Sequence, residues 1–170
     1  MIPVWLAAFP SSVPDTDTWP VVLLAAITIC LCVLVHYFFL WDMISRLSRR
    51  SMHTLVVICG TVLGLIAAHL IEIALFALSL FALVEIWETD IGGLAGQTEM
   101  IDAQGWYYYS AMVYTTVGFG DIVPTGPLRI FTACEALTGF VLITWSASFT
   151  FLVMQTRWKS KISSMGISPP

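Results

Sequence analysis

The run of residues 115–121, Thr-Thr-Val-Gly-Phe-Gly-Asp, has the residue types needed to bind a cation with backbone oxygens. To aim successive carbonyls at one axis, the backbone must alternate between ordinary and left-handed conformations, and glycine adopts the latter without a Cβ penalty. Gly118 and Gly120 are spaced as this alternation requires, and Thr116 adds a hydroxyl at the inner end. The motif therefore predicts a ring of oxygens that replaces the water around a cation.

The same run resembles the selectivity filter of tetrameric pore-loop potassium channels, with phenylalanine where tyrosine is commoner. The resemblance implies that five consecutive residues form the ion-binding filter and that the first four of them bind K⁺: Thr116, Val117, Gly118, Phe119 and Gly120. The two apolar side chains are expected to pack behind the strand, and Thr115 and Asp121 are expected to support it. An ordinary glycine turn is the alternative. It is disfavoured because the run follows an aromatic segment and lies between two long apolar segments.

Asp121 needs a partner in this arrangement. Some potassium channels hold a carboxylate in the pore helix behind the filter, and by register that place falls at Met112, which has no charge. We therefore expect Tyr108 or Tyr109 to donate a hydrogen bond to Asp121.

The composition is that of a membrane protein: the 170 residues are 58% hydrophobic and 11% charged. Three apolar segments are long enough to cross a hydrocarbon core, which takes about 20 residues: 21–41, 54–87 and 127–154. The net charge of −4 disfavours nucleic acid as a partner. The sequence has no phosphate loop, dinucleotide fingerprint or metal box, so we expect transport and no enzyme activity.

We expect an all-α transmembrane fold with a re-entrant pore helix and filter between the second and third spans. The predicted segments are an extracellular N-terminal segment 1–20, an extra transmembrane helix 21–41, a cytoplasmic basic loop 42–53, a pore domain 54–154 and a cytoplasmic tail 155–170. The pore domain divides into an outer helix 54–87, a turret 88–105, a pore helix with filter 106–121 and an inner helix 127–154. This module resembles the two-helix pore domain of the potassium channels.

The positive charges predict the orientation. Six of the seven Lys and Arg residues follow the first or the third span: Arg46, Arg49, Arg50, Arg157, Lys159 and Lys161. Cytoplasmic loops carry such an excess, so the N-terminus is expected outside, the C-terminus in the cytoplasm, and the pore loop at the extracellular face. The expected location is the plasma (inner) membrane of a prokaryote.

The inner helix has a glycine where the inner helices of potassium channels often carry a hinge. Gly139 can serve as that hinge or as a site of close helix packing. The family register, which helical spacing accommodates, places four residues on the cavity side: Phe140, Ile143, Ala147 and Phe151.

Three ionisable residues lie deep within the second and third apolar spans, where exposure to lipid is costly. His69 and Glu72 are three residues apart on one helix face, and Glu135 is on the third span. We expect a polar network of these three residues behind the filter. It is either a fixed structural network or one that titrates and gates.

One filter strand cannot enclose an ion, and the chain has no second copy of the motif, so the expected assembly is a homotetramer in lipid. The expected function is passive, potassium-selective conduction, with K⁺ in the filter and with no cofactor or small-molecule substrate other than ions. The alternatives are a weakly selective monovalent cation channel on the same fold, and a non-conducting membrane subunit that kept the pore architecture.

Overall fold

The computed structural model describes residues 18–49, 53–86, 94–96 and 103–164. Three long helices dominate it: α1 (Trp19–Arg49), α2 (Thr54–Phe81) and α4 (Leu128–Ser164). A π-helical segment, η1 (Ala82–Ile86), continues α2. Three short elements lie between η1 and α4 in the sequence: strand β1 (Leu94–Gly96), helix α3 (Ala103–Tyr114) and strand β2 (Ile122–Pro124).

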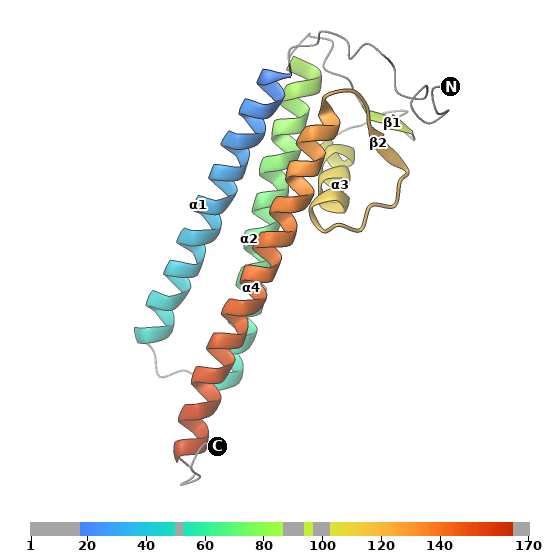
Figure 1. The fold of residues 1–170 in the computed structure, drawn as a ribbon. Helices are drawn as coiled ribbons and strands as arrows, with labels where there is room; N and C mark the ends of the chain where they lie inside the picture. The colour runs from blue at the N-terminus through green and yellow to red at the C-terminus, as the bar shows by residue number, and fades with distance from the viewer. Residues whose placement is uncertain (1–17, 50–52, 87–93, 97–102, 165–170) are drawn as a thin grey trace, which may run out of the picture.

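The three long helices lie side by side, and α3 and the two strands lie beside one end of them, away from the C-terminus (Figure 1). Each long helix contains a stretch long and apolar enough to cross a membrane: Trp19–Arg46, Thr54–Val84 and Leu128–Lys159. The three predicted apolar segments therefore form helices that are long and apolar enough to cross a membrane.

The helices differ in length from the predicted segments. α1 continues past residue 41 to Arg49, and α4 continues to Ser164. The extension of α1 is polar and includes an ion pair one turn apart, in which Arg46 Nε lies 2.7 Å from Asp42 Oδ2. Hydrophobicity marks only the part of a helix that crosses the membrane, so its polar ends were not predicted. Residues 1–17 of the N-terminal segment, and all of the turret except 94–96 and 103–105, lie outside the described residues.

A short two-stranded sheet adds to the helical fold. β1 pairs antiparallel with β2, with Leu94 opposite Pro124 and Gly96 opposite Ile122. The sheet joins part of the segment before α3 to the residues that follow the filter motif. It therefore holds the chain on both sides of the motif.

Apolar side chains pack α3 against α2 and α4. The main core has members from all four helices, including Phe76 of α2, Tyr114 of α3 and Phe131 of α4. The rings of Phe76 and Phe131 meet edge to face, with centroids 5.8 Å apart. α1 contributes Val21, Ala25 and Cys32 to the same core. The first helix is thus packed against the proposed pore domain and is not a separate element.

Candidate functional site

The motif begins directly after the last turn of α3. The amide of Thr116 donates a hydrogen bond to the Val113 carbonyl oxygen at 2.9 Å. The amides of Val117 and Gly118 both donate to the Met112 carbonyl oxygen, at 3.0 and 3.1 Å. These bonds use carbonyls that the end of a helix leaves without an internal partner. The helix end therefore fixes where the motif starts.

The backbone of the motif alternates in handedness. Thr116, Gly118 and Gly120 have positive φ angles of 60°, 53° and 79°, and no other residue from 115 to 121 does. Thr116 is the one non-glycine with positive φ in the described part of the chain. For a β-branched residue this conformation is a genuine outlier, and such strain concentrates at functional sites.

The side chains of the motif are uncovered in the single chain. Val117 is 52% exposed and Phe119 is 70% exposed. Within one chain these side chains are uncovered, and the prediction that they pack behind the strand concerns the assembly of four chains. Thr115 is exposed as well, but its hydroxyl donates a hydrogen bond to the Ala111 carbonyl oxygen at 2.6 Å.

Asp121, at the outer end of the motif, has two hydrogen-bond donors. Tyr108 Oη donates to Asp121 Oδ2 at 2.8 Å, and the amide of Ile122 donates to Oδ1 at 3.1 Å. This hydrogen bond raises the pKa of Tyr108, because the neutral phenol is the donor to the carboxylate. The hydroxyl oxygen of Tyr109, the other candidate, lies 3.0 Å from Thr132 Oγ1 and not at Asp121.

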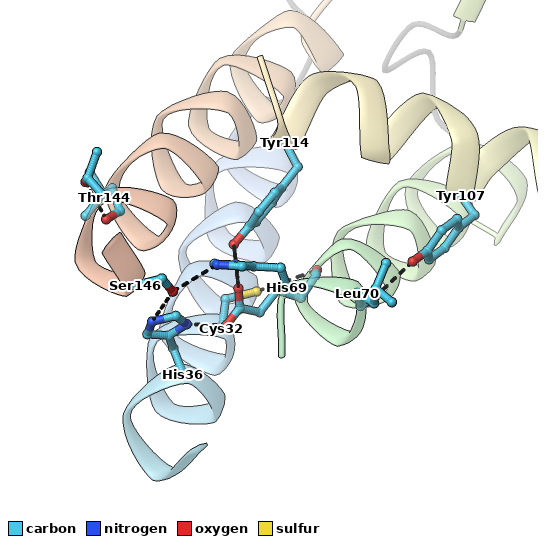
Figure 2. Close-up of polar contacts among 10 residues, drawn as sticks. Cys32, His36, His69, Leu70, Tyr107, Tyr114, Thr144 and Ser146 are labelled. Carbon is cyan, nitrogen blue, oxygen red and sulfur yellow. Dashed lines mark hydrogen bonds and ion pairs between the residues drawn. The ribbon is translucent and has the colours of Figure 1, made fainter. Parts of the chain in front are cut away.

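Four polar side chains from three helices form a closed ring in the interior, which we call the polar ring: His36, His69, Glu72 and Ser146. Glu72 Oε1 lies 2.8 Å from His36 Nδ1, and Oε2 lies 2.9 Å from His69 Nδ1. The other ring nitrogens both face Ser146 Oγ, at 2.9 Å from His69 Nε2 and 3.3 Å from His36 Nε2. Figure 2 shows the two imidazoles on either side of Ser146.

Tyr114 connects the polar ring to the motif. It is the last residue of α3, and its hydroxyl donates a hydrogen bond to Glu72 Oε2. The same hydroxyl oxygen lies 3.0 Å from His69 Nδ1, so the phenol points from the end of α3 into the ring (Figure 2). The residue before Thr115 is thereby bonded to groups on α2, while α1 reaches the same carboxylate through His36.

The sequence predicted His69 and Glu72 as partners, and the structure brings them together. It missed His36, Tyr114 and Ser146. A usable signal existed for His36, the one Asp, Glu, His, Lys or Arg residue in the apolar part of α1. It lies as many residues from the start of α1 at Trp19 as His69 lies from the end of η1 at Ile86. The two histidines therefore have matching depths along neighbouring helices.

Glu135 is placed apart from this ring, in contrast to the expected network. Its Oε1 contacts Ser110 Oγ, and its Oε2 is buried without a hydrogen-bond partner. Ser110 Oγ also lies 3.0 Å from the Ile73 carbonyl oxygen, which can only accept. Since a serine hydroxyl has one proton, Ser110 can donate to Glu135 Oε1 or to the Ile73 carbonyl oxygen, but not fully to both.

Gly139 lies where α4 crosses the end of α3. A Cβ at this position would overlap the carbonyl oxygen of Tyr114, so close packing requires glycine here. α4 continues as a helix through this residue. The four residues assigned to the cavity side share an exposed face of α4 in the single chain: Phe140, Ile143, Ala147 and Phe151.

The chain was compared with known proteins. No curated protein and no solved structure matches it. A family model described as an ion channel matches residues 68–156, more than half of the chain. The match begins at the part of α2 that carries His69 and includes α3, the motif and most of α4. With three apolar helices and this match, the protein is an integral membrane protein that belongs to the ion channel family and conducts ions passively.

Proposed function

We propose that the protein is a potassium-selective channel in which four identical chains surround one pore. Residues 115–121 form the filter, and the coordinating oxygens come from Thr116, Val117, Gly118 and Phe119, with Gly120 completing the strand. The observation that carries the proposal is the alternation of handedness. With positive φ at every second residue from 116 to 120, successive carbonyls can turn to the same side of the strand.

Thr116 supports the filter assignment because its conformation is unfavourable for its residue type. A glycine there would adopt φ 60° without strain, so a threonine is expected only where its hydroxyl is used. In the proposed filter that hydroxyl binds K⁺ at the inner end. α3 ends just before it, so the negative end of the helix dipole favours a cation at the same place.

The assembly of four chains is supported by what one chain leaves uncovered. The filter strand, with Val117 and Phe119, and the exposed face of α4, with Phe140 and Phe151, carry large apolar side chains. Lipid can cover the apolar face of a spanning helix, whereas the filter strand belongs to no spanning helix and leaves Val117 and Phe119 for other chains to cover. Neighbouring chains would cover the filter strand from behind, and four strands together would enclose the ions.

The proposed orientation places the filter toward the cell exterior. α3 lies at one end of the helices, while the C-terminal ends of α1 and α4, which carry the basic residues, lie at the other (Figure 1). Basic residues favour the cytoplasmic side. The N-terminus is then outside and the C-terminus inside, in the plasma membrane of a prokaryote.

The test is potassium flux from purified protein in liposomes, with Thr116→Ala as the diagnostic variant. We expect barium to block flux in the unmodified protein and the variant to lose it. Thr156→Ala is the matched control. Among the described residues its hydroxyl bonds the Leu152 carbonyl oxygen of its own helix, at 2.8 Å, so flux should persist. Undiminished flux in Thr116→Ala would exclude residue 116 from the pore.

Selectivity is tested separately, by reversal potentials with sodium opposite potassium. A potential close to the potassium equilibrium value supports a selective filter. A potential near zero identifies the alternative, a weakly selective monovalent cation channel on the same fold. A non-conducting subunit would give no flux alone and would purify as a mixed oligomer.

A further inference from the structure

The polar ring contains more contacts than its own groups can fill with protons. Each contact between two nitrogen or oxygen atoms at hydrogen-bonding distance needs one proton between them. The ring has four such contacts, and the bond from Tyr114 to Glu72 makes a fifth. The additional approach of His69 Nδ1 to the Tyr114 oxygen, at 3.0 Å, shares the His69 proton and needs none of its own.

Four protons are available when both imidazoles are neutral and Glu72 is ionised. One comes from each histidine, one from Ser146 and one from Tyr114. The longest of the five contacts, the 3.3 Å between His36 Nε2 and Ser146 Oγ, would then bring two lone pairs face to face. One more proton, on a histidine or on Glu72, fills all five contacts and makes the group electrically neutral.

We propose that the polar ring is a binding site for one excess proton in each chain, and that this proton controls conduction through Tyr114. The ring would hold the proton at low pH and release it as pH rises. The part of the proposal that concerns conduction rests on the proposed channel function. The part that concerns proton binding rests on the contacts alone.

The distances favour a proton over a metal ion at the same place. The side chains of His36, His69 and Glu72 each offer a ligand atom, all within 4.8 Å of one another. Ligands of a tetrahedral zinc ion at about 2.0 Å lie about 3.3 Å apart. The histidine nitrogens are 2.8 and 2.9 Å from the carboxylate oxygens, which is the spacing of hydrogen bonds.

The surroundings supply no other positive charge to Glu72 among the described residues. Its ion pairs there are with His36 and His69. The other titratable neighbours are Cys32 of α1, whose Sγ lies 3.9 Å from the Glu72 carbonyl oxygen, and Tyr114 of α3. Glu135 of α4 is close enough to act electrostatically on Cys32 and Tyr114.

Burial favours the neutral, proton-bound form of the ring. Glu72 and His36 are 0% exposed, and all of these neighbours are neutral or acidic. An uncompensated carboxylate in such an interior is strongly unfavourable. The proton removes that charge without requiring a lysine or arginine.

The link to conduction runs through one side chain. Tyr114 is the residue before Thr115, and its hydroxyl is held by Glu72. When the excess proton leaves, the unfilled contact separates and the ring loses its geometry. The ionised Glu72 carboxylate still accepts from Tyr114, but it shifts as the ring separates, and Tyr114 and the start of the filter shift with it. Conduction should therefore fall as pH rises.

Proton binding can be measured without flux, by nuclear magnetic resonance of the full-length protein in bilayers with labelled histidine and glutamate. The chain has three histidines, and the exposed His53 serves as the internal reference. We expect the His36, His69 and Glu72 signals to change together in one step as pH rises, separate from the change in the His53 signal. Independent titration of His36 and His69 with His53 would overturn the proposal. So would stoichiometric zinc in the purified protein that is lost in His36→Gln.

Flux tests the control of conduction, with Glu72→Gln as the diagnostic variant. A glutamine amide has the shape of a protonated carboxyl and can donate to His36 Nδ1, so it imitates the proton-bound ring. As pH rises through the step at which the ring releases its proton, we expect flux of the unmodified protein to fall about tenfold. This is the factor that one net hydrogen bond of about 1.4 kcal/mol is worth. The variant should keep the higher flux across the same pH range.

His53→Gln is the matched control and should keep the pH step of the unmodified protein. A pH step that survives unchanged in Glu72→Gln would refute control by the ring. Absence of flux from the unmodified protein at every pH would instead contradict the channel proposal. In that case the magnetic resonance titration still decides whether the ring binds a proton.

Discussion

Two tyrosines of α3 donate hydrogen bonds to carboxylates, one near each end of the proposed filter. Tyr108 bonds Asp121 at the outer end and is 37% exposed, whereas Tyr114 bonds Glu72 at the inner end and is 0% exposed. The chemistry of the two contacts is the same. Their surroundings differ, because water can reach the first pair and is excluded from the second.

The comparison shows that the two ends of the filter motif are held with unequal strength. When an exposed hydrogen bond breaks, water replaces the lost partner, and the net loss is small. When the buried bond breaks, a carboxylate is left without a donor in an apolar interior. The inner end should therefore be a fixed anchor, and the outer end the place where the motif yields first.

Gly139→Ala should have the largest effect, because it disturbs Tyr114 at the buried inner end of the motif. Its methyl group would overlap the Tyr114 carbonyl oxygen, and backbone cannot move aside as a side chain can. Overpacking of this kind costs about 3 kcal/mol. We expect a marked drop in thermal unfolding temperature and loss of flux, measured on purified protein in detergent and in liposomes.

Gly60→Ala is the matched control for that variant. Gly60 is also inside a long helix, but a Cβ there would meet nothing within 4 Å in the chain. Because alanine favours a helix over glycine by about 1 kcal/mol, stability should stay equal or rise. Equal losses in both variants would show that small size, and not the contact with Tyr114, is what position 139 requires.

Tyr114→Phe should have the next largest effect. It removes one hydroxyl and keeps the aromatic ring of residue 114 in the core. The loss of a hydrogen bond to a buried carboxylate costs about 2 kcal/mol. We expect a lower unfolding temperature, lower flux and no remaining pH step in flux. The joint titration of His36 and His69 should persist. An unchanged pH step in flux would show that the polar ring acts on the filter by another route.

Tyr108→Phe should have the smallest effect. We expect an unchanged unfolding temperature and a shorter duration of conduction, recorded as faster decay of single-channel activity. The hydrogen bond raises the pKa of Tyr108, so its contribution is complete below the ordinary tyrosine pKa of about 10 and is lost as pH rises through the raised value. The difference between variant and unmodified protein should vanish in that alkaline range. A fall in stability as large as that of Tyr114→Phe would contradict the unequal anchoring.

The long helices could be predicted because hydrophobic length alone defines them. The three apolar segments each became a helix, but the ends did not coincide, since α1 and α4 continue into polar residues that a hydrophobic criterion ignores. The pairing of β1 with β2 was not predicted. A contact between two three-residue strands depends on how the chain turns at the motif, and neither strand has a periodic pattern to reveal it.

The candidate site was only partly readable for a related reason. His69 and Glu72 lie one turn apart on one helix, so their spacing reveals the contact. His36 and Ser146 come from other helices, and sequence does not fix how those helices rotate about their axes. Glu135 was grouped with the ring by depth alone. Rotation of α4 instead directs it to Ser110.

The contact at Gly139 has a mechanical consequence. α4 touches the last residue of α3 there without intervening side-chain atoms, so α4 cannot move toward α3 at Gly139. Any bending or axial rotation of α4 near this residue must displace Tyr114, and with it the first residue of the motif. Movement of the inner helix and distortion of the filter are then one event and not two. A conformational change that closes the pore at either place would change the structure at the other.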